Sequence, residues 1–172
     1  GIRDLFRPRG HGDVYQGQVH LHRLGRTVLD VDNAWFTLLT QNTAPIHFDR
    51  HYAAGTEFGR PLVDSTFTLA LVTGQSVADV SQNVMANLGW DEVRLPAPVY
   101  EGDTIYSESE VLEVRPSRSR PQVGVVTVRT TGHNQEGVVV ITFRRTILVY
   151  RRGHGPAADR PRPALPPAGP AR

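Results

Sequence analysis

The residues best suited to acid–base chemistry lie in one short stretch, where an amide, an imidazole and a carboxylate occur at Asn42, His47 and Asp49. An imidazole with an ordinary pKa of about 6.5 can take up and return a proton near neutrality. The Asn42 amide cannot act as a base, but it can accept a hydrogen bond from water and donate one to a substrate. From the residue alone, a His47 that satisfies a turn backbone is the favoured interpretation, and Asn42 could simply end a helix. Asp49 could either orient the imidazole or cap a short helix over residues 50–54.

The composition excludes several other kinds of site. The chain has 172 residues and no cysteine, and all 19 of its basic residues are arginine. Thiolate nucleophiles, disulfides, Cys-ligated metal clusters and lysine Schiff bases are therefore ruled out. His20 and His22 alternate along a strand-like segment, and His47 and His51 are one helical turn apart, but two histidines without a third ligand do not predict a metal site. No Gly-rich nucleotide-binding motif is present either.

The positive charge is concentrated near the C-terminus. Residues 151–172 hold five arginines and one aspartate, so residues 1–150 carry a net charge of −2. A body without excess positive charge does not predict a nucleic-acid interface. The same terminal segment contains six prolines, which predicts a flexible Pro/Arg-rich tail over residues 151–172. No apolar run approaches a membrane-spanning length of about 18 residues, and no apolar signal region opens the chain, so we expect a cytoplasmic protein without a membrane span.

The spacing of apolar residues predicts a helical first half followed by strands. Helical spacing predicts a helix over residues 31–39, with Asp30 or Asp32 as its cap, and a longer buried helix that starts at Asp64 or Ser65. Alternating and β-branched runs predict four strands, at residues 88–95, 104–114, 123–131 and 138–150. Residues 134–137 are typical of a hairpin loop between the last two. This order indicates an α+β fold in which an antiparallel sheet wraps around a central helix.

Three motifs follow one another along the chain. They are Phe36-Thr37-Leu38-Leu39-Thr40 with Asn42-Thr43-Ala44-Pro45-Ile46-His47-Phe48-Asp49, then Gly59-Arg60-Pro61-Leu62-Val63-Asp64-Ser65, then Pro98-Val99-Tyr100-Glu101-Gly102-Asp103-Thr104. Together they resemble the MaoC-like dehydratases, a family that includes the (R)-specific enoyl-CoA hydratases. The resemblance covers residues 17–150, with residues 1–16 as an N-terminal arm. It implies the hotdog fold, an antiparallel sheet around a long central helix, and a homodimer or larger homo-oligomer.

The resemblance also implies a reaction, the reversible hydration and dehydration of an enoyl-CoA thioester. Coenzyme A is then part of the substrate, and no further cofactor or metal is expected. His47 would be the base, and the backbone N–H of Ser65 would donate to the thioester oxygen, because a helix N-terminus offers free donors. A carboxylate pointing at the developing enolate would hinder the reaction, so we expect Asp64 to cap the helix and turn away.

Asn42 departs from the usual family pattern, in which an aspartate shares the catalytic water with the histidine. A branch of the family that acts on branched or dicarboxylic enoyl-CoAs, such as mesaconyl-CoA hydratase, looks similar in this stretch. We therefore expect an itaconyl- or mesaconyl-CoA-like substrate, with Asn42 positioning water or substrate. An amide in place of a carboxylate removes a charge that would repel a second substrate carboxylate.

Arginines are the candidates for binding the phosphates of coenzyme A, because the guanidinium group pairs well with phosphate. Arg94 lies in a predicted strand, whereas Arg115, Arg118 and Arg120 lie in a segment between two strands. For the last three, an ordinary solvated loop explains the sequence at least as well.

Two other functions remain open at this point. One is a hotdog acyl-CoA thioesterase, which would need a carboxylate on or near the central helix, such as Asp64 or Glu57. The other is an acyl-CoA-binding module without catalysis, which the absence of the usual aspartate makes conceivable. Release of free thiol would identify the thioesterase, and binding without turnover would identify the module.

Overall fold

A computed structural model describes residues 14–156 of the chain. Its strands are β1 (Val19–Leu21), β2 (Arg26–Thr27), β3 (Val84–Arg94), β4 (Thr104–Pro116), β5 (Val123–His133) and β6 (Val139–Tyr150). Its helices are α1 (Asp30–Thr40), α2 (Arg50–Ala54) and α3 (Ser65–Gln75), with a 3-10 turn at Pro45–His47 and a π-helical turn at Val77–Ser81. Most of the predicted N-terminal arm (residues 1–13) and most of the predicted tail (residues 157–172) lie outside the described residues.

The strands form one antiparallel sheet in the order β1-β4-β5-β6-β3, and β2 pairs with the start of β4. The predicted hairpin between β5 and β6 is confirmed, because the side-chain oxygen of Asn134 accepts hydrogen bonds from the backbone of Glu136 and Val138 at 3.0 Å. Gly137 completes the turn with a φ of 80°, a conformation that favours glycine. The predicted meander of long strands is therefore present.

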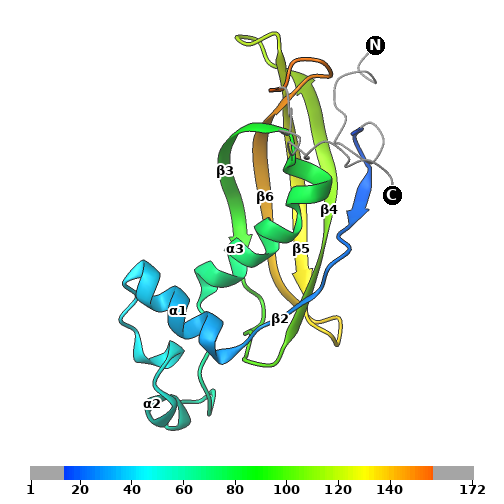
Figure 1. Ribbon diagram of the computed structural model, residues 1–172. Coiled ribbons are helices and arrows are strands. Elements are labelled where there is room, and N and C mark those ends of the chain that lie inside the picture. The colour runs from blue at the N-terminus through cyan, green and yellow to red at the C-terminus, as the bar shows by residue number, and fades with distance from the viewer. Residues whose placement is uncertain (1–13, 157–172) are drawn as a thin grey trace, which may run out of the picture.

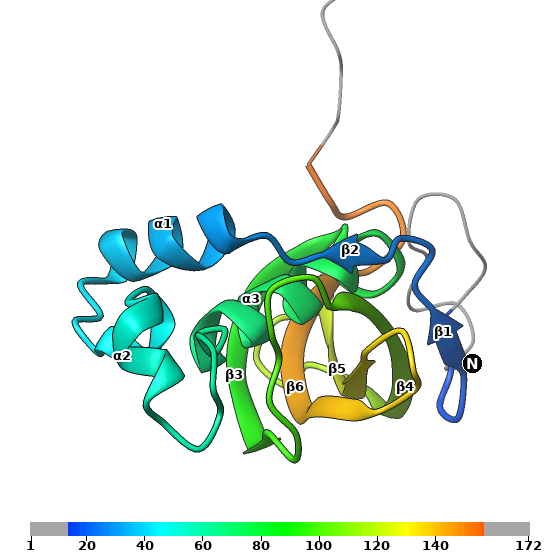
Figure 2. The same cartoon turned by 90° about the horizontal axis from the view of Figure 1, so that it is seen from below.

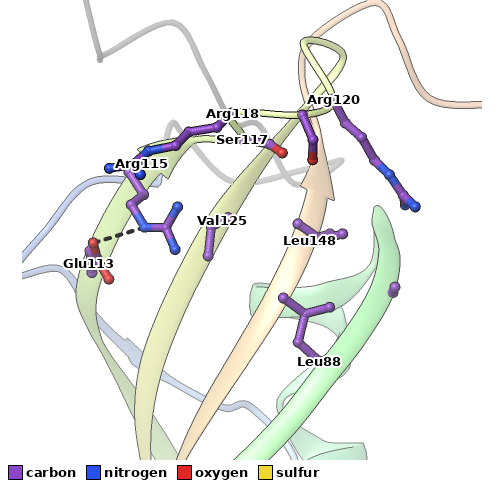
Figure 3. A pocket seen from close by; sticks show the side chains of 10 residues that line it. Leu88, Glu113, Arg115, Ser117, Arg118, Arg120, Val125 and Leu148 are labelled. Atoms are coloured by element: carbon purple, nitrogen blue, oxygen red, sulfur yellow. Dashed lines mark ion pairs between the residues drawn. The ribbon is translucent and has the colours of Figure 1, made fainter.

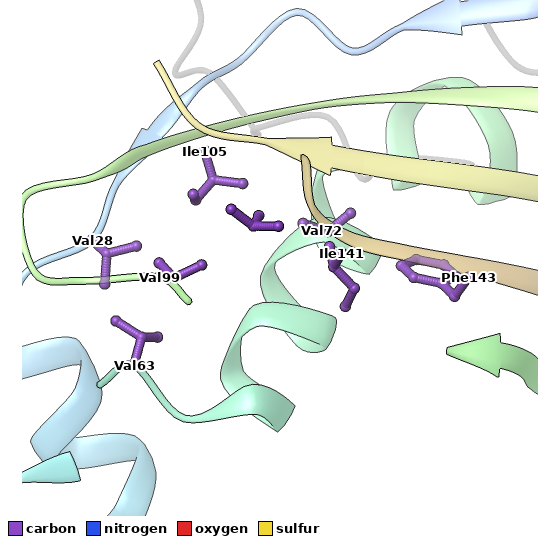
Figure 4. Packing of buried hydrophobic residues seen from close by; sticks show 8 residues of the cluster. Val28, Val63, Val72, Val99, Ile105, Ile141 and Phe143 are labelled. Atoms are coloured by element: carbon purple, nitrogen blue, oxygen red, sulfur yellow. The ribbon is translucent and has the colours of Figure 1, made fainter. Parts of the chain in front are cut away.

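Helix α3 lies across one face of this sheet, while α1 and α2 lie to one side, beyond the β3 edge (Figures 1 and 2). The α+β fold with a sheet around a central helix is therefore confirmed. Apolar side chains fill the space between α3 and the sheet, among them Val63, Val72, Val99, Ile141 and Phe143 (Figure 4).

The helix approaches β5 closely at Gly132. A Cβ atom there would lie 2.8 Å from side-chain carbons of both Val72 and Ile141. The absence of a side chain at this position lets α3 lie directly on the sheet.

Helix α1 differs from its predicted form in two ways. Its N-cap is Leu29 rather than Asp30 or Asp32. Asp32 instead accepts a hydrogen bond from the Leu29 backbone N–H at 2.8 Å and pairs with Arg26. The buried face of α1 carries Asn33 and Thr37, whereas the apolar residues at helical spacing point outward; Trp35, Leu38 and Leu39 are 67%, 78% and 80% exposed.

Two boundaries also differ from the predicted ones. The strand expected at residues 88–95 begins at Val84, because Val84 and Ala86 pair with the end of β6. The α-helical part of the central helix ends at Gln75, and the π-helical turn follows it after Ser76. The Arg145 side chain donates to the Ser76 hydroxyl at 3.3 Å. Within residues 14–156 no helix is long and apolar enough to cross a membrane. The cytoplasmic location stays a prediction.

Candidate active site

His47 is held by a backbone carbonyl in a way that fixes which ring nitrogen is free. It ends the 3-10 turn Pro45–His47, which connects α1 to α2, and is half-buried. Its Nδ1 lies 2.9 Å from the carbonyl oxygen of Leu62. A carbonyl only accepts hydrogen bonds, so Nδ1 must carry the proton in this contact. The neutral imidazole then presents the lone pair of Nε2, the atom that can take a proton from water.

Asn33 ties the His47 turn to the start of α3, although the sequence analysis did not single it out. Its side-chain nitrogen donates to the carbonyl oxygens of His47 at 2.6 Å and of Leu62 at 2.8 Å. Its side-chain oxygen accepts from the backbone N–H of Asp64 at 2.9 Å. Asn33 is 4% exposed. No local sequence signal marks it, because its partners lie far along the chain and the apolar residues of α1 point to the other face.

Asp64 caps α3, as expected from the sequence, and its carboxylate is turned away from solvent. One carboxylate oxygen accepts from the backbone N–H groups of Thr66 at 2.7 Å and Phe67 at 3.3 Å. The other accepts from the Asn42 amide at 2.6 Å. Burial alone would raise the pKa of Asp64, but hydrogen bonds from the Thr66 side chain, Asn42 and the two backbone groups outweigh it and hold this pKa below its ordinary value.

Asn42 occupies the position where the family pattern has an aspartate, and its side-chain amide donates to the carboxylate of Asp64. Its carbonyl oxygen also accepts from the backbone N–H of Ala44 at 3.0 Å, which stabilises the turn that follows α1. An amide has two donor hydrogens and two acceptor lone pairs. After these contacts, one hydrogen and one lone pair of Asn42 remain for a water or a substrate group.

Asp49 acts as a helix cap and does not orient the imidazole. Its carboxylate accepts from the backbone N–H of Tyr52 at 2.9 Å, at the first turn of α2. The orienting contact to His47 comes instead from the Leu62 carbonyl. The sequence left both interpretations of Asp49 open, and the structure supports the cap.

Ser65 is the first residue of α3 and lines a cavity of about 270 Å³. The backbone N–H groups in the first turn of a helix have no partner within the helix, and in residues 14–156 the Ser65 N–H donates no hydrogen bond. Leu62, whose carbonyl holds His47, lines the same cavity. The remaining lining residues are Phe58, Val63, Thr68, Leu95, Pro96, Ala97, Pro98 and Val99.

The candidate phosphate-binding arginines divide into two places. Arg94 ends β3 and directly precedes Leu95, which lines the Ser65 cavity. Arg115, Arg118 and Arg120 lie at the other end of the sheet, where β4 turns into β5 (Figures 1 and 3). Of the four candidate arginines, Arg94 is the one that lies next to the lining of the Ser65 cavity in the same chain.

The carboxylates considered for a thioesterase are not placed for it. Both oxygens of Asp64 are engaged in the cap and with Asn42, and Asp64 is 3% exposed. Glu57 is exposed, lies between α2 and α3, and does not line the Ser65 cavity. In the described part of the chain, no three residues among His, Cys, Asp and Glu gather closely enough to hold a metal ion.

Comparison with known sequences agrees with this geometry. The family described as MaoC like domain matches residues 14–134, which include the His47 turn, the Asp64 cap and the start of α3. The chain belongs to the MaoC-like family. The resemblance inferred from its motifs is thereby confirmed.

Among MaoC-like relatives, a mesaconyl-CoA hydratase of Cereibacter sphaeroides is 34% identical over 154 residues, and a beta-methylmalyl-CoA dehydratase of Chloroflexus aurantiacus is 33% identical over 155 residues. Each alignment covers 90% of this chain and 44% of the relative. The chain thus spans less than half the length of these relatives.

Solved structures confirm the hotdog fold. A MaoC domain protein dehydratase from Chloroflexus aurantiacus superposes with a TM-score of 0.78 at 33% identity, covering 90% of this chain and 44% of that one. A protein of Mycobacterium tuberculosis with a double hotdog fold superposes with a TM-score of 0.72 at 25% identity, covering 90% of this chain and 51% of that one. This MaoC-like chain thus spans about half the length of each of these two structures.

Proposed function

We propose that this protein reversibly hydrates a short enoyl-CoA thioester whose acyl group is branched or carries a second carboxylate. The observation that carries the proposal is the His47 contact, which ties Nδ1 to the carbonyl of Leu62 and leaves Nε2 as the nitrogen that can act as a base. Leu62 also lines the Ser65 cavity, so the same residue connects the imidazole to that cavity. Membership of the MaoC-like family and the names of the two relatives support the same reaction.

In the proposed reaction, His47 is the proton carrier. A water oxygen bonds to C3 of the enoyl group while its proton passes to Nε2 of His47, and the electrons of the C2–C3 double bond move toward the thioester carbonyl. The imidazolium then returns a proton to C2. Nδ1 donates to the Leu62 carbonyl throughout, so Nε2 is the nitrogen that takes up and returns the proton in both hydration and dehydration. General acid–base catalysis of this kind contributes roughly 10²–10⁴-fold to the rate.

The N-terminus of α3 stabilises the negative charge that develops on the thioester oxygen during the reaction. The developing enolate oxygen accepts from the Ser65 backbone N–H, where the helix carries roughly half a positive charge. Asp64 is the nearest negative charge in the cap, but its oxygens point to Thr66, Phe67 and Asn42. A preorganised donor at an oxyanion is worth about 10²–10³-fold.

The substrate class follows from Asn42. An aspartate at this position would lie beside the buried carboxylate of Asp64, with which Asn42 now forms a 2.6 Å hydrogen bond. The neutral amide avoids a second negative charge in the site and keeps one free donor hydrogen. A substrate carboxylate is therefore repelled less than it would be by the usual aspartate, which favours mesaconyl- or itaconyl-like thioesters.

The active form is proposed to be a homodimer or larger homo-oligomer. The exposed apolar residues of α1 and the long edge strand β3 are surfaces that isolated chains do not usually leave uncovered. The match to one unit of a double hotdog protein supports the same assembly. Light scattering should show at least a dimer, and a fully active, monodisperse monomer would contradict it.

The reaction is tested by incubating the protein separately with mesaconyl-CoA and crotonyl-CoA. The proposal requires loss of the enoyl-thioester absorbance without release of free thiol, with a higher kcat/KM for the mesaconyl ester. Free thiol would identify a thioesterase instead. Tight binding of both esters without turnover would identify a binding module.

A further inference from the structure

The loop between β4 and β5, at the end of the sheet, borders an open hollow of about 900 Å³ on the sheet face opposite α3 (Figure 3). Side chains alternate between the two faces of a strand. Val126 and Ile147 belong to the cluster on the α3 side, so their neighbours Val125 and Leu148 point to the opposite face, where they line the hollow. We name this site the outer-face hollow.

The outer-face hollow is far from the Ser65 cavity of the same chain. Thr104, at the start of β4, pairs with Thr27 close to α1, whereas Arg115 lies near the other end of β4. Eleven residue steps along an extended strand correspond to about 35 Å. The Arg115 end and the α1–α2 end accordingly lie at opposite ends of the sheet (Figure 1).

The rim of the hollow carries uncompensated positive charge. Arg115, Arg118 and Arg120 line it together with a single acid, Glu113, which pairs with Arg115 at 3.1 Å. Arg118 forms no ion pair within residues 14–156, and the Arg120 side chain, also without an ion pair there, donates a hydrogen bond to the Met85 sulfur at 3.7 Å. Two guanidinium groups are therefore free to bind an anion.

The loop that presents these arginines is braced by hydrogen bonds. The backbone N–H of Val123 donates to the Arg120 carbonyl at 3.1 Å, and that of Ser117 donates to the Val123 carbonyl at 3.2 Å. From the end of β6, the Arg151 side chain donates to the Pro121 carbonyl at 2.8 Å. A braced loop loses less conformational entropy when a ligand binds.

The floor of the hollow is apolar. Leu88 on the edge strand is 56% exposed, and Leu148 and Val125 lie beside it. The volume falls in the range of about 300–1,000 Å³ that is typical of small-molecule pockets. An apolar floor with a cationic rim matches a ligand that joins a flat apolar body to phosphate groups.

We propose that the outer-face hollow binds a phosphorylated ligand of the adenine-nucleotide type. Its phosphates contact Arg118 and Arg120, and its base lies on Leu88 and Leu148. Two sources provide this chemistry, a free nucleotide and the nucleotide end of a coenzyme A ester that is bound at another subunit. Only the second source rests on the proposed hydratase function.

Binding is tested by calorimetry with adenosine 3′,5′-bisphosphate, and with inorganic phosphate as a probe without the base. The bisphosphate should bind more tightly than phosphate. The double variant Arg118→Ala/Arg120→Ala should raise its Kd at least about tenfold, since each charge-assisted hydrogen bond is worth about 1.5 kcal/mol or more. Leu88→Glu places a negative charge on the floor and should weaken binding by a similar factor.

Arg129→Ala is the matched control. Arg129 is a half-exposed arginine on β5 that pairs with Glu110 and does not line the hollow. Its loss should leave the Kd within twofold. The proposal is overturned if the bisphosphate does not bind at millimolar concentration, or if the control weakens binding as much as the double variant does.

Measuring KM for two substrates in the double variant distinguishes a free nucleotide from the nucleotide end of the coenzyme A ester. If the ligand is the nucleotide end of the substrate, the double variant raises KM for the enoyl-CoA ester and leaves KM for the matching pantetheine ester unchanged. If the ligand is a free nucleotide, nucleotide binding is lost while both KM values stay the same. Because binding is measured without turnover, a protein inactive as a hydratase still tests the hollow.

Discussion

Beside α1, the carboxylate of Asp64 is buried and accepts hydrogen bonds from Thr66, Phe67 and Asn42. At the opposite end of the sheet, Arg118 lies in a loop and has no carboxylate partner within the described residues 14–156. In the first region, hydrogen bonds within the chain stabilise the charge of Asp64, and two polar groups there have no hydrogen bond among residues 14–156, the Nε2 atom of His47 and the Ser65 N–H. In the second region, the positive charges of Arg118 and Arg120 have no ion-pair partner among residues 14–156. The first arrangement suits proton transfer to a bound substrate, and the second suits recognition of an anion.

The largest change to the first region is the loss of its base. His47→Ala should lower kcat at least about a hundredfold and change KM little, because the imidazole acts in the transition state. The fold should persist, since His47 lies in a half-buried turn. Near wild-type turnover in this variant would remove His47 from the mechanism.

Asn33→Ala breaks the links between the His47 turn and α3. The carbonyls of His47 and Leu62 and the backbone N–H of Asp64 would lose a buried partner, so the free energy of unfolding should fall by about 3 kcal/mol. Activity should fall as well, because the orientation of His47 depends on Leu62.

Thr37→Val is the control for Asn33→Ala. Thr37 is buried on the same face of α1, but its hydroxyl donates only within the helix, to the Ala34 carbonyl at 2.8 Å. Chemical denaturation should show a loss near 1 kcal/mol or less, with kcat unchanged. Equal losses in both variants would mean that Asn33 contributes packing rather than the three hydrogen bonds.

Asn42→Asp brings a second carboxylate against Asp64. Like charges at this distance force one group to keep its proton, so the pKa of the pair rises and stability falls by about 2 kcal/mol near pH 7. The loss should shrink as the pH falls, because the raised pKa makes protonation relieve the repulsion. The ratio of kcat/KM for mesaconyl-CoA to that for crotonyl-CoA should also fall, while Asn42→Ala adds no charge and should not show the pH-dependent loss.

The exchange Asn42→Asp/Asp64→Asn separates charge from position. Asparagine is a good helix cap, and the hydrogen bond between the two side chains can form again with its polarity reversed. Thermal unfolding should recover most of the stability lost in Asn42→Asp. An additive double variant, with both single losses summed, would show that the two side chains are not coupled.

The smallest expected effect is the change in the free energy of unfolding at acid pH. Because the folded-state pKa of Asp64 is lowered, its contribution is fully present above the unfolded pKa of about 3.9 and is lost as the pH falls through the lower folded value. The difference in unfolding free energy between the wild type and Asp64→Asn should therefore narrow below about pH 4. A constant difference down to pH 2 would contradict the lowered pKa of Asp64.

The sequence was informative where function depends on neighbours in the chain. The motif around His47, the cap chemistry of Asp64 and the helix start at Ser65 are local, and the long strands follow from alternation. Asn33 was missed because its partners His47, Leu62 and Asp64 lie 14, 29 and 31 residues away.

The face of α1 and the grouping of the arginines could not be read from the sequence for the same reason. Helical spacing marks the apolar stripe of Trp35, Leu38 and Leu39, but which surface covers it depends on packing beyond the helix. The division of Arg94 from Arg115, Arg118 and Arg120 depends on how β3 and β4 run along the sheet, which only the strand pairing fixes.

The central claim is that the Leu62 carbonyl holds the proton on Nδ1 of His47 and leaves Nε2 free. Long-range nitrogen–proton NMR spectra of the imidazoles report this tautomer directly, with the His47 signals assigned by their absence in His47→Gln. For the neutral ring, the account predicts a protonated, pyrrole-like Nδ1 and an unprotonated, pyridine-like Nε2. A spectrum with the proton on Nε2 would contradict it, because that nitrogen could not then accept a proton from water.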